Sequence, residues 1–401
     1  MSYSMKKRAL VTKTETQAGQ SSDPLDKAGN YANPAKQDVS LEELSYTREN
    51  SKEDENRSIL DGTLTGQAAI PGVSTGGLDF KISYNPGETY PDTVNVGEFI
   101  HSYPPARYLQ SAGLGEVTIW DEAGAPALAD YPYGAKRLYY PSLGATANSY
   151  TATVLEKSDD GVDGIANELI GIVNNLVINA ESAASSYAME FSGNGGVDSV
   201  FAVPAADLDK FVFEDDDVLK TAIDTYIYTD VYIKDNETGV ETNFCSRQAS
   251  LDLGNQITSL PCQIGGSGIK QYNITEFQPR MVLEPELQPL DVLDTWAGVT
   301  STKTYTVRLV SHYKVAAGEI SLEMWMPQAQ LLSATSSDND NTLYEELTFR
   351  PLKNVDAEIP VVSVLDAATG LTPVIWDGSN MTEFQKKEMM FAIIISEIVR
   401  Q

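Results

Sequence analysis

The sequence predicts a mainly β protein, built as a β-sandwich or half-barrel with short flanking helices. Two observations point to this fold class. Short segments in which apolar and polar residues alternate recur along the chain, and Gly and Pro residues separate them. The hydrophobic share is 42% over 401 residues, which is enough to bury sizeable cores and argues against global disorder.

The balance of charge is strongly acidic. The chain has 28 Lys and Arg residues against 57 Asp and Glu residues, which gives a formal net charge of −29. Mutual repulsion at this charge opposes compaction, so we infer that the protein has a use for repulsion. Proteins that grip DNA neutralise phosphates with Lys and Arg. The composition therefore disfavours a DNA-gripping protein and predicts that nucleic acid near this chain is repelled.

Residues 1–60 are predicted to form an extended N-terminal arm and loops. This segment is polar from residue 12 onward, with scattered Pro, Gly, Asn and Ser residues. Such a segment does not pack by itself, so we expect it to become ordered against other surfaces, including a second subunit. The residues expected to offer apolar contacts are Val39, Leu41, Leu44 and Tyr46.

Residues 61–225 are predicted to form a first β domain. Leu78–Tyr84 alternates apolar with polar residues, which is typical of a half-buried strand. Pro104 and Pro105 then precede a short helix that Gly113 closes, because Pro suits the first helical turn and Gly follows the last. Further strands are expected at Val117–Trp120, Leu138–Tyr140, Ser149–Leu155, Ile170–Ile178 and Tyr187–Phe191.

Residues 226–401 are predicted to form a second β domain with a C-terminal extension. Here too a short helix, from Pro289 to Gly298, lies between strands. The order of strand, Pro-started helix, Gly stop and further strands is shared with the first half, so the sequence predicts two similar domains in tandem. The strands are expected at Ile269–Phe277, Arg280–Leu283, Tyr305–Val310, Glu319–Met326 and Leu343–Arg350.

The last 20 residues, from Thr382, fit two structures. A helix starting near Asn380 would have Glu383 three residues on, at the spacing of a capping box. A long strand through the run FAIIISEIV fits equally well. Periodicity does not separate the two for so short an apolar run, and both alternatives stay open.

The sequence predicts no catalytic, cofactor-binding or metal-binding residue. Phe213–Asp217 is acidic but lacks the ligand spacing of a metal cage. Asp159–Gly164 resembles the start of a calcium loop, yet Ile170 stands where such a loop needs Glu. We interpret the first as a solvated loop or the start of a helix, and the second as a hairpin turn. Cys245 and Cys262 are too few for a disulfide framework or a four-ligand zinc site.

Other residue types that often carry function have no partners in the sequence. His101 and His312 fall in expected strands without a recognisable triad or ligand set. The glycines at 265–268 precede no helix that would make a phosphate-binding loop. The glycosylation sequons at Asn273 and Asn380 follow no secretory signal. No apolar run is long enough to cross a bilayer, so we expect folding in a cytoplasm and no membrane partner.

Three groups of segments, taken in order, resemble the major tail tube proteins of tailed bacteriophages. The first matches an opening strand with a K-x-E-T-x-x-G turn, the second a hairpin with an F-x-G end, and the third a D-x-G-N segment with a P-x-A strand end. Residues from Val361 onward have no counterpart. The first group is Lys7–Gly19 and, after a polar stretch, Leu41–Arg48, which is similar to the family's extended N-terminal arm; the second is Tyr150–Leu155, a turn at Asp160 and Gly161, Ile170–Ile178 and Tyr187–Gly193; the third is Leu251–Asn255, Met324–Leu331 and Tyr344–Phe349.

The resemblance implies a non-enzymatic structural subunit of a phage tail tube, with two tube-type folds in tandem. Such subunits form rings, which are hexamers or trimers of pseudo-sixfold symmetry, and the rings stack into a hollow tube. Genomic DNA passes through an acidic-lined channel without specific binding. The implied partners are the chain itself and the tail terminator, tape measure and distal tail proteins, and the implied location is the virion tail after synthesis in the host cytoplasm.

Two other classes of function stay open. One is a different virion β-protein, such as a sheath, decoration or fibre domain, which would bind a surface and enclose no channel. The other is a carbohydrate-binding or hydrolysing β-sandwich, which needs a cleft with clustered aromatic residues and paired acids. The tryptophans show no such cluster along the chain; they are Trp120, Trp296, Trp325 and Trp376.

Overall fold

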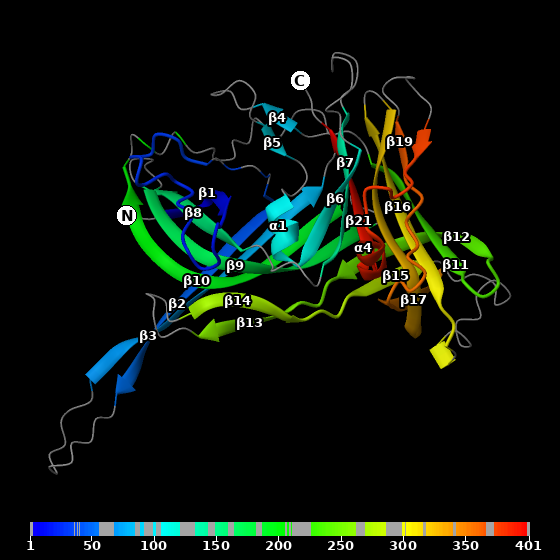
Figure 1. Ribbon diagram of the computed structural model, residues 1–401. Coiled ribbons are helices and arrows are strands. Elements are labelled where there is room, and N and C mark those ends of the chain that lie inside the picture. Colours follow the sequence, from blue (N-terminus) through cyan, green and yellow to red (C-terminus); the bar gives the residue numbers. More distant parts are fainter. Residues whose placement is uncertain are drawn as a thin grey trace, which may run out of the picture.

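The computed structural model describes residues 3–35, 37, 39, 41–55, 68–84, 89–91, 99–101, 106–120, 133–142, 149–158, 164–181, 187–204, 207, 210, 226–261, 269–285, 299–300, 302–315, 318–339, 342–365 and 373–398. Antiparallel strands make up most of these residues, and the helices among them are short (Figure 1). The prediction of a mainly β fold of the sandwich or half-barrel type is confirmed.

The described residues in the first part of the chain form ten strands and the helix α1. They are β1 (Tyr3–Thr14), β2 (Glu43–Glu55), β3 (Ala68–Tyr84), β4 (Thr89–Pro91), β5 (Phe99–His101), α1 (Ala106–Ser111), β6 (Leu114–Trp120), β7 (Tyr133–Pro141), β8 (Tyr150–Ser158), β9 (Gly164–Glu181) and β10 (Tyr187–Val203).

The second part forms eleven further strands and one more described helix. They are β11 (Tyr226–Asp235), β12 (Glu241–Asp252), β13 (Gln256–Pro261), β14 (Ile269–Glu276), β15 (Arg280–Pro285), β16 (Tyr305–Val315), β17 (Gly318–Asn339), β18 (Thr342–Pro351), β19 (Ser363–Leu365), β20 (Pro373–Ile375), α4 (Glu383–Glu388) and β21 (Ala392–Ile398).

These elements agree with the local predictions wherever they are described. The expected strands all occur, most of them as parts of longer strands. Helix α1 ends just before Gly113, which has a φ of +86°, so a residue that tolerates the left-handed region stands where the chain must turn. The helix expected between Pro289 and Gly298 lies outside the described residues.

One large antiparallel sheet joins most of the strands. Its main path runs in the order β2-β3-β10-β9-β12-β11-β16-β17-β21-β7-β6. The N-terminal part of β9 also pairs with β8, and β8 carries β1 on its other side. Helix α1 lies above the long, curved strands β9 and β10 (Figure 1). Three two-stranded sheets, β4–β5, β13–β14 and β19–β20, lie off this path.

Six strands of the large sheet close on themselves, and we call them the six-strand barrel. β12 pairs with β11, β11 with β16, β16 with β17, β17 with β18, β18 with β15, and β15 again with β12. Closure removes the free edges of these strands. Side chains fill a barrel of so few strands, and the buried residues here include Val231, Leu309, Met326 and Leu347.

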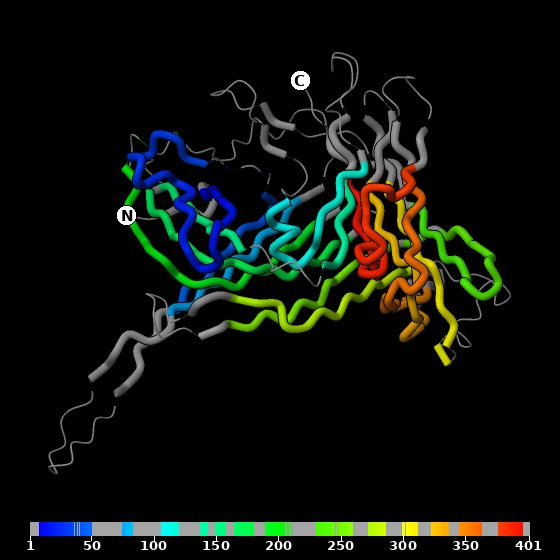
Figure 2. Tube along the Cα trace, in the orientation of Figure 1, coloured from blue at the N-terminus to red at the C-terminus, as the bar shows by residue number. Residues whose placement is uncertain are grey.

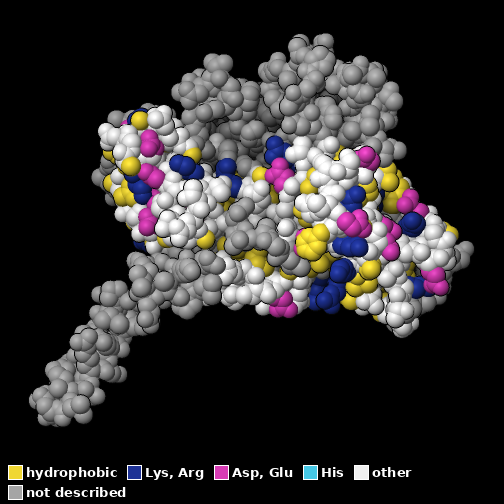
Figure 3. All heavy atoms as spheres, in the orientation of Figure 1, with side chains coloured by type: hydrophobic (Ala, Val, Ile, Leu, Met, Phe, Trp, Pro, Cys, Tyr) yellow, Lys and Arg dark blue, Asp and Glu magenta, His cyan; other side chains and the backbone are white. Residues whose placement is uncertain are grey.

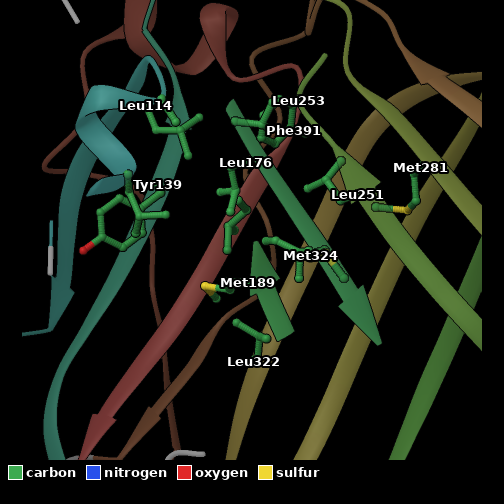
Figure 4. Packing of buried hydrophobic residues seen from close by; sticks show 14 of the residues in the cluster. Leu114, Tyr139, Leu176, Met189, Leu251, Leu253, Met281, Leu322, Met324 and Phe391 are labelled. Carbon is green, nitrogen blue, oxygen red and sulfur yellow. The ribbon is translucent and has the colours of Figure 1, made fainter. Parts of the chain in front are cut away.

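One apolar core joins the two halves of the chain. Leu176 and Met189 from the first half pack in the same cluster as Leu251 and Met324 from the second half (Figure 4). The sheet also continues across residue 225, because β9 pairs with β12 and β7 pairs with β21. The predicted tandem domains 61–225 and 226–401 therefore share one sheet and one core.

The N-terminal residues are more tightly integrated than their composition predicts. β1 and β2 both pair within the sheet, and the N-terminal trace lies against β8, β9 and β10 (Figure 2). Leu25, which was not among the expected contacts, is fully buried against Val11 and Leu155, and Val39 is fully buried in the main core. The described residues of this segment are thus ordered against strands of the same chain, and the expected contact with a second subunit stays a prediction. A few widely spaced apolar residues suffice here because distant strands supply the rest of each cluster.

The C-terminal residues adopt both of the alternatives, one after the other. Helix α4 comes first, and its capping box joins Thr382 to Gln385 rather than Asn380 to Glu383. β21 follows and inserts between β17 and β7. Residues 393–395 of this strand are isoleucines, and all three are buried, which explains the dense apolar run.

Candidate functional site: the polar face of the sheet

The large sheet has one polar, solvent-facing side across β2, β3, β10, β9 and β12, which we call the polar face. The strand register lines up one row of side chains from Glu43 through Lys81, Glu190 and Val177 to Asp252. Glu43 and Asp252 are exposed, and the three residues between them are partly exposed. Because residues directly opposite in antiparallel strands point to the same side, the row lies on one face.

Small polar residues fill the rest of this face. Asn179 donates a hydrogen bond to Glu190 (3.1 Å), and the Lys81 ammonium group forms a salt bridge with Glu42 (3.3 Å). The remaining surface offers hydroxyl and amide groups but few large apolar side chains. Its members next to the charged row are Ser45, Thr47, Asp79, Asn175, Ser192, Asn194 and Ser250.

The other face of the same strands is apolar and covered. Phe80 of β3 stacks on Phe191 of β10 at 4.9 Å between ring centroids, and both rings contact Tyr108 of α1. Leu176 and Leu251 on the neighbouring strands are fully buried in the same cluster. The period-two alternation along each strand thus separates a packed side from a polar side.

Hydrogen bonds fix α1 to the covered face. Asn174 Nδ2 donates to Ser111 Oγ (2.8 Å), and Asn174 Oδ1 accepts from the hydroxyl of Tyr150 (3.1 Å). Burial raises the pKa of Tyr150 well above its ordinary value, so the hydroxyl stays protonated. The hydroxyls of Tyr108 and Thr12 lie 2.7 Å apart and connect α1 to β1. The helix is thereby held to two strands that are far apart in sequence.

The D-x-G-N segment supplies a second connection. Asn255 Nδ2 donates to the carbonyl of Ala112 at the end of α1 (2.8 Å) and to that of Asn174 (3.1 Å). Asp252 Oδ1 accepts from the backbone N–H of Gly254 (2.8 Å), which has a φ of +62°. A Cβ on Gly254 would lie 2.5 Å from the carbonyl oxygen of Gln278. This turn therefore needs glycine for both its conformation and its space.

The K-x-E-T-x-x-G turn is organised around one carboxylate. Glu15 accepts hydrogen bonds from the backbone N–H of Gly19 (2.8 Å) and from that of Gly171 (2.7 Å). The hydroxyls of Ser149 and Thr151 donate to the same carboxylate at 2.8 and 2.9 Å. Four donors around a single carboxylate connect the N-terminal turn to β8 and β9, so the residues that carry the resemblance have structural roles.

The N-terminal loop is also held by a buried acid. Glu168 of β9 is fully buried and pairs with the ammonium group of Lys27 (2.9 Å), and Ser21 Oγ donates to it (2.8 Å). Burial and a hydrogen bond with Asp198 raise the pKa of Glu168, while Lys27 and Ser21 oppose the rise. The N-terminal loop around Ser21 and Lys27 is therefore attached to β9 through the carboxyl group of Glu168, whose charge depends on pH.

The two ends of the main sheet path carry strands with an unpaired side. Within the described part of the chain, β2 pairs only with β3, and β6 pairs only with β7. Arg8 Nη1 donates to the carbonyl of Leu44 (3.2 Å), and Asn380 Nδ2 donates to that of Thr118 (2.5 Å). Within the described residues no further strand pairs with either edge, so both edges offer backbone groups to an additional strand.

One polar cavity of about 640 Å³ lies beside the β11–β12 turn. Lys234, Lys303, Glu237, Asp356 and Glu358 line it together with neutral polar residues. Because both positive and negative side chains line the cavity, it favours neither anionic nor cationic ligands. Among the residues that the structure describes, no group of three or more His, Cys, Asp and Glu side chains could hold a metal ion. None of the described helices is long and apolar enough to span a membrane.

The residues singled out from the sequence do not form a common site. Trp325 and Trp376 are buried in one apolar cluster between β21 and the segment that contains α4. His312 lies on β16 and Cys245 on β12. The acidic run Phe213–Asp217, the residues 159–163, and Cys262 lie outside the described residues. Sequence reasoning missed the polar face, although the alternation in Leu78–Tyr84 already separates its Asp79 and Lys81 from the core.

Comparisons with known proteins give no family. No family model and no curated protein matches the chain. Among solved structures, the chain is similar to a mutant form of the Hcp1 protein from E. coli EAEC 042, with 11% identity and a TM-score of 0.24, over 31% of this chain and 86% of that one. It is also similar to MrkH, described as a c-di-GMP-dependent transcription regulatory factor, with 9% identity and a TM-score of 0.13, over 55% of this chain and 69% of that one. At these TM-scores neither likeness supports an argument about fold or function.

Proposed function

We propose that this chain is a non-enzymatic structural subunit that assembles with copies of itself into rings, and that stacked rings form the tail tube of a tailed bacteriophage. The observation that carries the proposal is a continuous sheet whose end strands, β2 and β6, each have one edge that no described strand pairs with. Exposed edges recruit strands from other chains, and a closed ring removes them. The order of the three sequence segments that resemble tail tube proteins adds independent support.

The polar face supports a conduit in this proposal. Its described charged residues include more acids than bases, and the gaps between them hold Ser, Thr and Asn residues. A wall of this kind holds phosphates weakly, because few cations are available to replace the counterions of DNA. We place the polar face toward the channel and the covered face, with α1, away from it. Tail terminator, tape measure and distal tail proteins are the further partners, and the virion tail is the location.

Negative-stain electron microscopy of the purified chain tests the proposal. The chain is concentrated at several salt concentrations and imaged. We expect rings or stacked rings with a central channel, either trimers of pseudo-sixfold symmetry or hexamers. Particles that stay monomeric under all conditions, or that form aggregates without a channel, would contradict it. A surface-binding virion protein would give particles that decorate a capsid or tube without enclosing a channel.

A further inference from the structure

Two arginines lie side by side on the outer wall of the six-strand barrel. β15 and β18 pair Met281 with Phe349, so the next position places Arg280 opposite Arg350. Met281 and Phe349 are buried, whereas both arginines are exposed. Because alternate residues of a strand point to opposite sides, both guanidinium groups lie on the outer side.

No acid in the described part of the chain forms a direct ion pair with either arginine. Neither guanidinium group forms a salt bridge or a hydrogen bond with a described residue. Asp252 is the neighbour of Arg280 across β12, but its carboxylate instead accepts hydrogen bonds from Gly254 and Asn175. Like charges directly opposite in a sheet are destabilising, so the pair has a cost within the subunit.

We propose that this basic patch, consisting of Arg280 and Arg350, binds an acidic surface of a second copy of this chain. The charges of the two surfaces are complementary. The chain has a net charge of −29, so a copy of itself is an acidic partner. Arg forms bidentate hydrogen bonds with carboxylates, and attraction at one defined place offsets part of the repulsion between subunits. Lys and Arg side chains gather below the centre of the face drawn in Figure 3.

The β2 end of the sheet supplies suitable acids. Glu43 and Glu49 are exposed there at the lateral edge of the polar face, along the strand with an unpaired edge. The row of side chains that begins at Glu43 continues past Asp252 to Arg280 on the barrel, so the acids and the arginines stand at the two lateral ends of one face, where neighbouring subunits of a ring meet. We assign these carboxylates as the partner's contact. The inference rests on the proposed self-assembly and names a contact within it, whereas duplex DNA as the anionic partner is the alternative that the experiment must separate.

Charge reversal of the patch tests the inference against a matched control. Arg280→Glu with Arg350→Glu is compared with Lys13→Glu with Lys234→Glu, which changes the net charge equally at cations on β1 and β11. The protein concentration at half-assembly is measured by sedimentation and microscopy. We expect it to rise about tenfold for the patch variant and less than about threefold for the control, because a lost attraction adds to the general repulsion. Arg280→Lys with Arg350→Lys should fall between the wild type and the patch variant, because both charges remain but the bidentate hydrogen bonds are lost.

A complementary variant keeps the test informative. Glu43→Lys with Glu49→Lys, introduced into the patch variant itself, should restore assembly to within about threefold of the wild type, since opposite charges meet again at every contact. The inference fails if the wild type assembles and the patch variant behaves like the control, or if the combined variant shows no rescue. It also fails if the wild type binds duplex DNA and the patch variant does not. If the wild type forms no rings at all, the proposed function fails instead.

Discussion

The carboxylate of Glu15 accepts a hydrogen bond of 2.7 Å from the backbone N–H of Gly171, 156 residues away in sequence. Gly171 lies in β9 at an irregular position, where the pairing of β9 with both β8 and β10 shifts register. Its φ of +64° turns the N–H toward the N-terminal turn. A β-bulge that would weaken the sheet in isolation thus provides the attachment point for the start of the chain.

Glu15→Gln is expected to destabilise the protein by about 1–3 kcal/mol, because the amide of Gln places a donor among four donors and one hydrogen bond becomes unfavourable. Urea unfolding followed by fluorescence measures the difference. Thr16→Ala serves as the control, since Thr16 is exposed and lies next to Glu15 in the same turn. Equal unfolding midpoints for Glu15→Gln and the wild type would contradict the role assigned to this carboxylate.

Gly171→Ala is expected to destabilise the protein by about 1–2 kcal/mol, the cost of the left-handed region for a residue with a Cβ. Space is not the cause, because a Cβ at this position would lie 3.5 Å from Gly19 Cα, an ordinary contact. Gly171→Asn should lose less, since Asn tolerates the left-handed region better than Ala does. The same urea titration gives both values, and an Asn variant less stable than the Ala variant would argue against a conformational origin.

Asn255→Ala is expected to cost about 1–3 kcal/mol, because it leaves the carbonyl groups of Ala112 and Asn174 without their side-chain donor. Amide hydrogen exchange in α1 should increase in this variant, since Asn255 connects the end of that helix to β9. Asn243→Ala is the matched control, because Asn243 is exposed and donates only to Asp230 at 3.3 Å. Unchanged protection of α1 in the Asn255 variant would show that the packing of Tyr108 alone holds the helix.

Stability should fall with rising pH through the titration of Glu168. Folding raises the pKa of this carboxyl above its ordinary value of 4.5 through burial and Asp198, so the folded state binds the proton more tightly. The stabilisation that comes from this tighter proton binding is present below pH 4.5. It is lost as the pH rises through the pKa that Glu168 has in the folded state. Lys27→Met should enlarge this loss, because Lys27 lowers that pKa, and Glu168→Gln should abolish it. Unfolding free energies measured from pH 4 to 8 test whether the loss of stability is largest in Lys27→Met, smaller in the wild type and absent in Glu168→Gln. A smaller loss in Lys27→Met than in the wild type would refute this expectation.

Local sequence patterns predicted the strands and α1. They did not predict features that depend on contacts between residues far apart in the sequence. The alternation in Leu78–Tyr84 is a property of one strand, so it is visible without the fold. The burial of Leu25 is not, because Val11 and Leu155 surround it only after β1 and β8 pair. The polar face was missed for the same reason, since its charged row comes from five strands whose register emerges only in the sheet. The Gly in K-x-E-T-x-x-G was visible as a turn, but its hydrogen bond to Glu15 was not.

Replacing acids of the polar face by Lys should leave ring assembly intact but should make the rings bind DNA. The wild-type chain is expected to assemble more readily as salt rises, because screening weakens repulsion between exposed charges beyond about 10 Å at 0.1 M salt. It should not retard duplex DNA at any salt. Asp79→Lys with Glu190→Lys leaves the unpaired edges and the basic patch intact, so rings should still form. These rings should bind duplex DNA at low salt and release it steeply as salt increases, because the added cations displace counterions from phosphates.

Gel retardation and microscopy on the same samples check this expectation. Glu237→Lys with Glu358→Lys is the matched control, because it makes the same change in net charge at exposed residues beside the polar cavity. If the polar face lines the channel, the control rings should bind DNA differently, at their outer surface, where added nuclease still reaches it. DNA held by Asp79→Lys with Glu190→Lys should instead be protected from nuclease inside the tube. Tight, salt-sensitive DNA binding by the unmodified chain would overturn the charge argument and, with it, the assignment of this face to a conduit.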